Sequence, residues 1–207
     1  MTPVHPPLVR PTLVLASASR ARAAMLERAG VDVVCDPAGI DEHAIKEQGR
    51  AAGATVEATA DTLAERKAHA VSLRHPGALV LGADQMLECD GVWIDKPEDR
   101  AHAAAHLAIL RGRSHRLVSA AVVVRDGVRL WETVDAATLT MRAFGDAFLH
   151  QYLDAAGEDV LHSVGVYHLE GLGAQLFERV EGDYFTVLGL PLLPVLGFLR
   201  SQGVLPA

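Results

Sequence analysis

Cysteine and long hydrophobic runs are what this sequence most clearly lacks. Only two cysteines occur among 207 residues, Cys35 and Cys89, and they form no C-x-x-C pair. This excludes a disulfide framework and a zinc ribbon and is typical of a reducing compartment. No apolar stretch is long enough to span a bilayer, and residues 1–11 hold several prolines in place of a signal-peptide core. We therefore expect a cytoplasmic protein without a membrane partner, in which residues 1–11 form a flexible extension.

Positive charge is also scarce, because 19 Lys and Arg residues stand against 26 Asp and Glu residues, giving a formal net charge of −7. Such a chain repels a long polyanion, so we expect no nucleic-acid partner. A small anionic ligand is compatible with this charge where local cations or a metal ion offset it. The Walker loop and the G-x-G-x-x-G loop are both missing, which excludes the two standard nucleotide-binding loops.

The alternation of short apolar runs with helix-forming segments predicts one α/β domain over residues 1–207, with parallel and antiparallel strands in its sheet. Asp-Gly pairs at 90–91 and 126–127 predict hairpin turns. The segment Pro37–Gly53 is polar and is expected to be turn-rich. The expected strands are 12–16, 31–35, 78–81, 117–124, 128–141 and 175–180, and the expected helices are 21–29, 55–73, 97–110, 144–155 and a last one after Pro191.

A candidate phosphate site lies between the first expected strand and the first expected helix. Ser17, Ser19, Arg20 and Arg22 fall at this junction. Hydroxyls, backbone N–H groups and a helix N-terminus together favour a phosphate, and guanidinium groups can fork onto its oxygens. A capped surface helix with solvated arginines would give the same pattern, so the residues alone leave both interpretations open.

Acidic residues and lysines supply the other candidates. Asp84 follows an apolar strand, where open α/β sheets place ligands, and could hold a metal or take a proton from water. Asp41 and Glu42 are adjacent acids that could ligate a hard divalent cation. Lys67 and Lys96 are the remaining cations of interest. A turn cap at Asp84, a solvated acidic loop and two surface lysines are the alternatives.

Taken in order, these segments resemble the Maf family of nucleotide pyrophosphatases over nearly the whole chain, from about residue 12 to residue 200. Each motif is weak alone, but seven in register are specific. The motifs are LVLASAS with Arg22, Asp41-Glu42, LAERKA, LVLGADQ, Lys96-Pro97, LRGRSH, and a final set of Gly165, Tyr167, Glu170 and Gly171 with EGDYFTVLGLPL.

The resemblance implies an elongated Maf/ITPase-like fold, with a central mixed sheet flanked by helices and a cleft between two lobes. It implies hydrolysis of a nucleoside triphosphate to the monophosphate and pyrophosphate with Mg²⁺ or Mn²⁺, in a protein that can form a homodimer. By position, Asp84 matches the proton acceptor and Glu42 the acid near the metal, which Asp84 would share. The groups matching those around the triphosphate are Ser17, Ser19, Arg22, Lys67 and Lys96, with Lys67 and Lys96 assisting catalysis.

The sequence also departs from the family pattern. Family members commonly carry Ser-x-Ser-Pro-Arg-Arg, whereas this chain has Arg20 and Ala21 at the proline and first arginine. One cationic group is therefore missing from its usual position, and the sequence leaves open whether Arg20 replaces it. The proposed base and both lysines are retained, so activity is still expected.

Three positions bear on the nucleotide base: Ala21, Gln85 and Glu170. The dTTP/UTP branch of the family usually has threonine and glutamine at the last two, and this chain is more similar to the 7-methyl-GTP branch. A carboxylate at Glu170 could accept hydrogen bonds from the N1–H and N2–H₂ edge of guanine, and would favour the positive charge of an N7-methylated ring. The alternatives are a dTTP/UTP pyrophosphatase and a non-catalytic nucleotide-binding regulator of septum formation.

Overall fold

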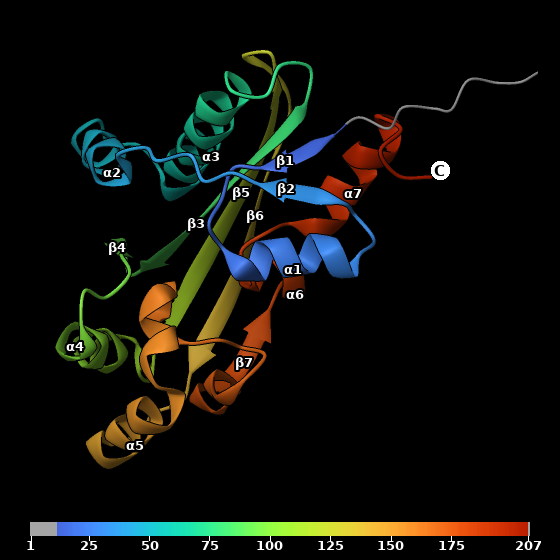
Figure 1. The fold of residues 1–207 in the computed structure, drawn as a ribbon. Helices are drawn as coiled ribbons and strands as arrows, with labels where there is room; N and C mark the ends of the chain where they lie inside the picture. The colour runs from blue at the N-terminus through green and yellow to red at the C-terminus, as the bar shows by residue number, and fades with distance from the viewer. Residues whose placement is uncertain (1–11, 207) are drawn as a thin grey trace, which may run out of the picture.

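The computed structural model describes residues 12–206, so the extension expected at residues 1–11 lies outside the described residues. The described chain is an α/β structure built on one seven-stranded sheet (Figure 1). Its strands are β1 (Leu13–Leu15), β2 (Val33–Cys35), β3 (Leu79–Cys89), β4 (Val92–Ile94), β5 (Ser114–Arg125), β6 (Val128–Met141) and β7 (Phe177–Glu181). Its α-helices are α1 (Arg20–Arg28), α2 (Glu42–Ala51), α3 (Val56–Ser72), α4 (Arg100–Leu110), α5 (Asp146–Ala156), α6 (Tyr184–Val187) and α7 (Leu192–Ser201), with 3₁₀ turns η1 (Glu158–His162), η2 (Val164–Val166) and η3 (Leu172–Leu176).

The sheet has the strand order β2-β1-β3-β5-β6-β7, and β4 pairs with β3 beside this path. The strand β1 runs parallel to both β2 and β3, while the other pairs are antiparallel. The expected mixed sheet is thus confirmed. Both Asp-Gly hairpins are also confirmed, because Asp90 and Asp126 have φ 51° and precede glycines with positive φ, as a tight hairpin turn requires.

Helices cover both faces of the sheet (Figure 1). The long helix α3 packs on one face through small and branched side chains such as Leu63 and Ala64. Helices α1 and α7 pack on the opposite face at one end of the sheet. Helices α4 and α5 form a separate apolar cluster toward the other end, together with Leu87 and Leu117. The long strands β3, β5 and β6 connect these two ends.

The structure corrects two sequence predictions that bear on the site. The segment 37–53 is not turn-rich throughout, because it contains the helix α2. Asp41 is the N-cap of this helix and accepts a hydrogen bond from the backbone N–H of Ala44 at 3.0 Å. The strand β3 does not end at Leu81 but continues to Cys89, so Asp84 lies in the middle of a strand rather than after one.

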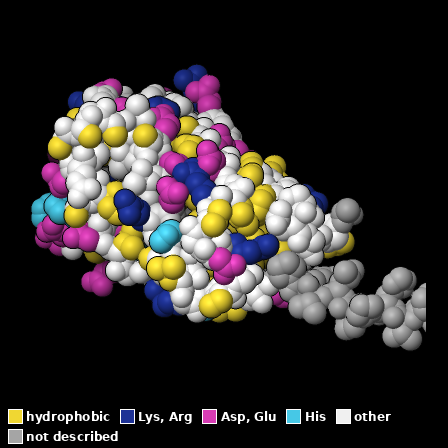
Figure 2. Space-filling view, turned by 90° about the horizontal axis from the view of Figure 1, so that it is seen from above, with side chains coloured by type: hydrophobic (Ala, Val, Ile, Leu, Met, Phe, Trp, Pro, Cys, Tyr) yellow, Lys and Arg dark blue, Asp and Glu magenta, His cyan; other side chains and the backbone are white. Residues whose placement is uncertain are grey.

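The helix expected from Pro97 begins instead at Arg100, since Asp99 is its N-cap. Among residues 12–206, no helix has both the length and the apolar character needed to cross a bilayer. Acidic, basic and hydrophobic side chains intermingle on the face seen in Figure 2.

Candidate active site

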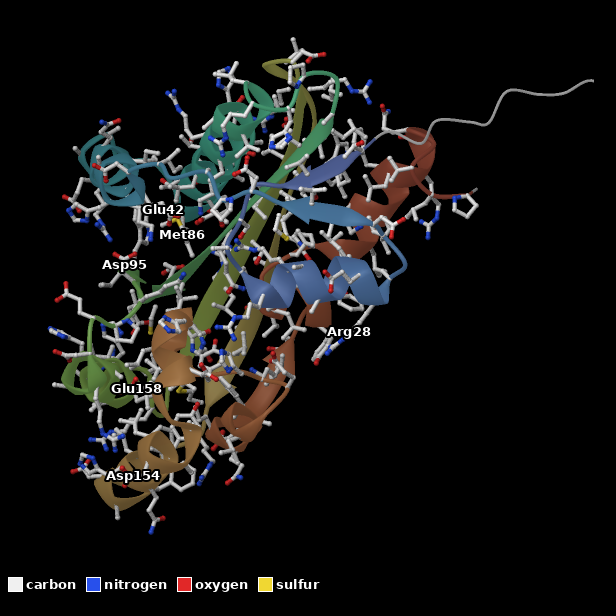
Figure 3. The ribbon with its side chains drawn as sticks, viewed as in Figure 1. Arg28, Glu42, Met86, Asp95, Asp154 and Glu158 are labelled. Atoms are coloured by element: carbon white, nitrogen blue, oxygen red, sulfur yellow. The ribbon has the colours of Figure 1, made fainter. Side chains whose placement is uncertain are left out.

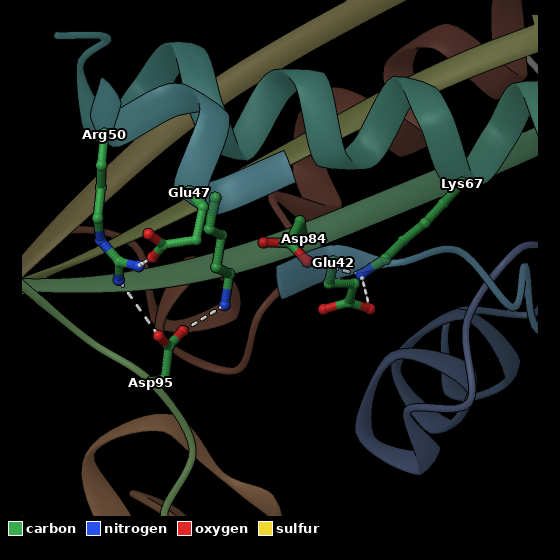
Figure 4. A network of polar contacts seen from close by, with 7 residues as sticks. Glu42, Glu47, Arg50, Lys67, Asp84 and Asp95 are labelled. Atoms are coloured by element: carbon green, nitrogen blue, oxygen red, sulfur yellow. Dashed lines mark hydrogen bonds and ion pairs between the residues drawn. The ribbon is translucent and has the colours of Figure 1, made fainter. Parts of the chain in front are cut away.

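Lys67 brings the carboxylates of Glu42 and Asp84 together (Figure 4). Its ammonium Nζ lies 2.6 Å from Asp84 Oδ1 and 2.8 Å from Glu42 Oε1. Both Lys67 and Asp84 are buried, whereas the side chain of Glu42 is about half exposed. Three residues from α3, α2 and β3 therefore meet, as the motif order indicated.

One oxygen of this cluster has no bonding partner. Asp84 Oδ1 accepts from Lys67, but Asp84 Oδ2 is buried without a hydrogen-bond partner among the described residues. An unpaired buried carboxylate oxygen costs free energy, so such an atom is expected where a ligand or a water completes the site. The oxygen is thus available for a substrate water or a cation.

Glu42 is the first residue of α2, and an ion-paired contact holds this helix at the site. Burial alone would raise the pKa of Glu42, but the ammonium of Lys67, helped by Lys46 and Lys96, outweighs burial and lowers it. Further along the helix, Lys46 lies 2.5 Å from Asp95, the residue before Lys96 (Figure 4). The ion pair between Lys46 and Asp95 therefore ties the helix that carries Glu42 to the segment that carries Lys96.

The loop in which a phosphate site was predicted lies directly after β1. Ser19 is the N-cap of α1 and accepts from the backbone N–H of Arg22 at 3.4 Å. Ser17 is buried, and its Oγ accepts from Ser19 N at 3.2 Å and from Arg22 Nη1 at 3.2 Å. The two serines thus organise the loop and the arginine side chain.

Arg22 is buried, and protein acceptors take up part of its guanidinium group. Its Nε donates to Gly189 O at 2.8 Å and its Nη1 donates to Ala83 O at 2.9 Å. Within residues 12–206, Nη2 makes no hydrogen bond or ion pair, which leaves its two N–H groups for a ligand. Burial lowers the pKa of Arg22, and the nearby carboxylates of Asp84 and Glu42 oppose that change.

The site lies where part of one side of β3 has no neighbouring strand. On one side of β3, the strand β1 pairs with residues 79–81 and β4 pairs with residues 87–89. Residues 82–86 have no strand partner on that side within residues 12–206, and Arg22 donates to the carbonyl of Ala83 there. The gap lets side chains from both faces of the sheet approach one ligand, because Asp84 and Gln85 point to opposite faces.

Lys96 and the first turn of α1 hold further predicted site residues. Burial lowers the pKa of Lys96, the cations Arg22 and Lys67 lower it further, and Glu42 and Asp84 oppose this. Arg20 and Ala21 are exposed in the first turn of α1. No hydrogen bond or ion pair of the Arg20 side chain is recorded in the described residues.

The two candidate base-recognition residues differ in their surroundings. Gln85 Nε2 donates to Ser119 Oγ at 3.2 Å, Thr186 O at 3.0 Å and Val187 O at 3.0 Å. Because backbone carbonyls only accept, the amide orientation is fixed and Oε1 remains as an acceptor. Glu170 is exposed in the turn between η2 and η3, and Arg179 pairs with Glu181 at 3.2 Å rather than with Glu170.

A divalent metal is compatible with the carboxylates present but not fully ligated by them. No group of three His, Cys, Asp or Glu residues suited to a metal occurs in residues 12–206. Mg²⁺ typically binds through one or two carboxylates together with substrate phosphates and waters. Glu42 and the unpaired Asp84 Oδ2 match that donor set.

A cavity of about 670 Å³ lies elsewhere, between α2 and α3, with Ile45 and Thr62 in its walls. Asp41 lines it, but Glu42, Lys67 and Asp84 do not, so the charged cluster and this cavity are separate features. Three residues that contact Arg22 or Gln85 were not among the predicted site residues: Gly189, Ser119 and Thr186. The signal for Ser119 was a lone hydroxyl within the apolar run of β5.

Comparison with known proteins agrees with the motif order. Residues 12–202 match the family described as Maf-like protein. A nucleoside triphosphate pyrophosphatase of Paramagnetospirillum magneticum is 58% identical over 93% of this chain and 99% of its own. A 7-methyl-GTP pyrophosphatase of Rhizobium etli is 49% identical over 94% of this chain and 98% of its own.

A solved dITP/XTP pyrophosphatase of Mycobacterium abscessus aligns over 92% of this chain and 97% of its own, with 18% identity and a TM-score of 0.46, which is too low to support an argument. The family match and the two close relatives each cover more than nine-tenths of the sequence. The chain therefore belongs to the Maf family.

Proposed function

We propose that this chain hydrolyses a nucleoside triphosphate between its α and β phosphates, releasing the monophosphate and pyrophosphate. The observation that carries the proposal is the contact of Lys67 with both Asp84 and Glu42, beside the buried guanidinium of Arg22. Three cations, counting Lys96, then face two carboxylates, so the site has a local positive excess within a chain of net charge −7. The activity named for its relatives supports the same conclusion.

In this proposal Asp84 is the general base. Lys67 fixes Oδ1, so the unpaired Oδ2 is the oxygen that takes a proton from the attacking water. Attack at the α-phosphorus places negative charge on the phosphoryl oxygens and on the departing pyrophosphate. No covalent intermediate is needed.

The cations stabilise the developing charge. Arg22 is held by Ser17, Ala83 and Gly189, so its Nη2 can bind a phosphoryl oxygen without reorganising. Lys96, whose pKa is lowered by burial and by neighbouring cations, regains a counter-charge when the triphosphate binds. The positive charges of Arg22 and Lys96 therefore stabilise the bound triphosphate.

Glu42 would hold the Mg²⁺ or Mn²⁺ ion of the proposed reaction beside Asp84, and the bound ion would neutralise phosphate charge. The direct test measures pyrophosphate, orthophosphate and monophosphate after incubation of the purified protein with Mg²⁺ or Mn²⁺ and nucleoside triphosphates. We expect pyrophosphate without orthophosphate, and a loss of about 10²- to 10⁴-fold in Asp84→Asn. Orthophosphate in place of pyrophosphate would contradict the proposal.

The matched control is Asp154→Asn. Asp154 is an exposed carboxylate on α5 that pairs with Arg100. In Figure 3 it lies at the lower end of the molecule, well away from Glu42. Its variant should keep the wild-type rate, so equal losses in both variants would argue against Asp84 as the base.

For the base, we propose a preference for 7-methyl-GTP over GTP, dTTP and UTP. Gln85 presents only its Oε1 acceptor, and the exposed carboxylate of Glu170 is a second acceptor. Two acceptors suit the N–H donors of guanine, and the anionic one suits a methylated, positively charged ring. Ala21, the third candidate position, is exposed in the first turn of α1.

The test compares kcat/KM for the four nucleotides in wild type and in Glu170→Gln. We expect the variant to lose the advantage of 7-methyl-GTP over GTP by about tenfold while turnover of GTP changes little. Glu178→Gln, an exposed glutamate on β7, is the control. Equal loss on all four nucleotides would remove Glu170 from base recognition.

A further inference from the structure

A row of polar side chains crosses the sheet next to the proposed site. In the strand register Gln85 of β3 lies opposite Ser119 of β5, which lies opposite Asp135 of β6. The row faces the same side as Ala83 and Leu87, whose side chains belong to two different apolar clusters. Polar groups at this boundary need hydrogen-bond partners, and the short helix α6 supplies them.

Thr186 of α6 is the central partner of the row. Its side chain is fully buried, and its Oγ1 donates to Asp135 Oδ2 at 2.7 Å. Its carbonyl accepts from Ser119 Oγ at 2.9 Å and from Gln85 Nε2 at 3.0 Å. Three strands therefore contribute hydrogen bonds to one residue of this four-residue helix.

The end of this helix reaches the arginine of the proposed phosphate site. Gly189 N donates to Thr186 O at 3.1 Å, which closes the turn after α6. Gly189 has φ 98°, a conformation that disfavours other residues, and its carbonyl accepts from Arg22 Nε at 2.8 Å. The position of the guanidinium thus depends on where Thr186 is held.

We propose that Asp135 and Thr186 are positioning residues, which fix Arg22 through Gly189 and fix the amide of Gln85 through the carbonyl of Thr186. This inference rests on the proposed function, because it assumes that Arg22 binds the triphosphate. Neither residue touches the substrate in this scheme. The charge-assisted bond from Thr186 to Asp135 sets the location of α6, and α6 sets the direction of Nη2.

The test replaces the Thr186 hydroxyl while preserving shape. Thr186→Val should weaken binding of an α,β-methylene nucleoside triphosphate about tenfold by calorimetry, and Thr186→Ser should restore it. Asp135→Asn, which keeps an acceptor but removes the charge, should fall between the two. Thr140→Val is the matched control, because Thr140 Oγ1 contacts Ser114 at the far end of β5 and β6. Thermal melting shows whether each variant is folded.

A double-mutant cycle separates positioning from a general structural role. In an Arg22→Ala background, Thr186→Val should change analogue binding by less than about twofold, because the group that it positions is gone. Equal losses in both backgrounds, or failure of Thr186→Ser to rescue, would overturn the inference. So would a wild-type protein that does not bind the analogue. Tight binding without pyrophosphate release would instead refute the proposed activity and leave the cycle interpretable.

Discussion

Gly82 of β3 lies directly against the backbone of Ala64 in α3. A β-carbon added to Gly82 would come 2.0 Å from Ala64 O and 2.7 Å from Ala68 N. Lys67 lies in the same turn of α3, and Asp84 lies two residues further along β3 on the same face. The close approach at the glycine is therefore what allows the Lys67 ammonium to reach Asp84 at 2.6 Å.

Gly82→Ala should destabilise the protein and displace Lys67, because backbone atoms of α3 cannot yield as a flexible side chain would. We expect a loss of about 3 kcal/mol or more in the free energy of unfolding, measured by urea denaturation. Gly197→Ala in α7 is the control, since nothing lies within 4 Å of its added β-carbon. That variant should be neutral or stabilised by up to about 1 kcal/mol. Similar effects at the two glycines would contradict the packing argument.

Glu42→Gln should raise the Mg²⁺ concentration needed for half-maximal pyrophosphate release by about tenfold or more. The amide keeps the shape of the side chain but removes the charge that faces Lys67 and the metal. Glu47→Gln is the control, because Glu47 is on the same helix and pairs with Arg50 instead. A chelator should abolish activity in all three proteins. An unchanged metal requirement in Glu42→Gln would remove this residue from the metal site.

Much of this architecture was predictable because local chemistry determines it. The serines of the first loop predicted the helix cap at Ser19, and the Asp-Gly pairs predicted both hairpins. The long helix expected over residues 55–73 is confirmed as Val56–Ser72, and Thr55 caps it. The motif order then indicated which charged residues belong together, and the structure brings Glu42, Lys67 and Asp84 into contact.

The features that the sequence did not predict depend on tertiary contacts, which no local sequence pattern shows. Helix α2 has no buried residue, and its mostly polar sequence gave the segment the composition of a loop. The continuation of β3 past Gly82 depends on its pairing with β5 over nine registered positions. Asp135 and Thr186 are 51 residues apart, and only the folded sheet shows that they share a hydrogen bond.

The loss of activity at alkaline pH (the alkaline limb of the pH–activity profile) should follow the deprotonation of Lys96. Its charged form is needed to stabilise phosphate charge, so activity is present below its pKa and lost as pH rises through it. Because burial and the cations Arg22 and Lys67 lower that pKa, kcat/KM should fall at a lower pH than an ordinary lysine would allow. Lys96→Arg should move the limb upward, since a guanidinium stays charged. In the control Lys46→Arg the limb should not move.

His115 should make the fold sensitive to acid. Its ring is buried, and its Nε2 lies 2.7 Å from the hydroxyl of Tyr167. Burial lowers the pKa of His115 to about 4, whereas an unfolded histidine titrates near 6.5. Between these values the unfolded chain binds a proton that the folded chain does not, so the free energy of unfolding falls as pH decreases.

The expected loss from this single group is about 3 kcal/mol between about pH 6.5 and about pH 4, as the shift of the pKa requires. Carboxylates with lowered pKa values, such as Asp36 and Glu42, also cost stability in acid, so the wild-type curve alone is not diagnostic. The difference between wild type and His115→Gln isolates the histidine, because the amide can still bond to Tyr167 but does not titrate. This difference in the free energy of unfolding, measured with urea, should change by about 3 kcal/mol between about pH 6.5 and about pH 4. A difference independent of pH would mean that His115 titrates in the folded protein as it does in the unfolded chain.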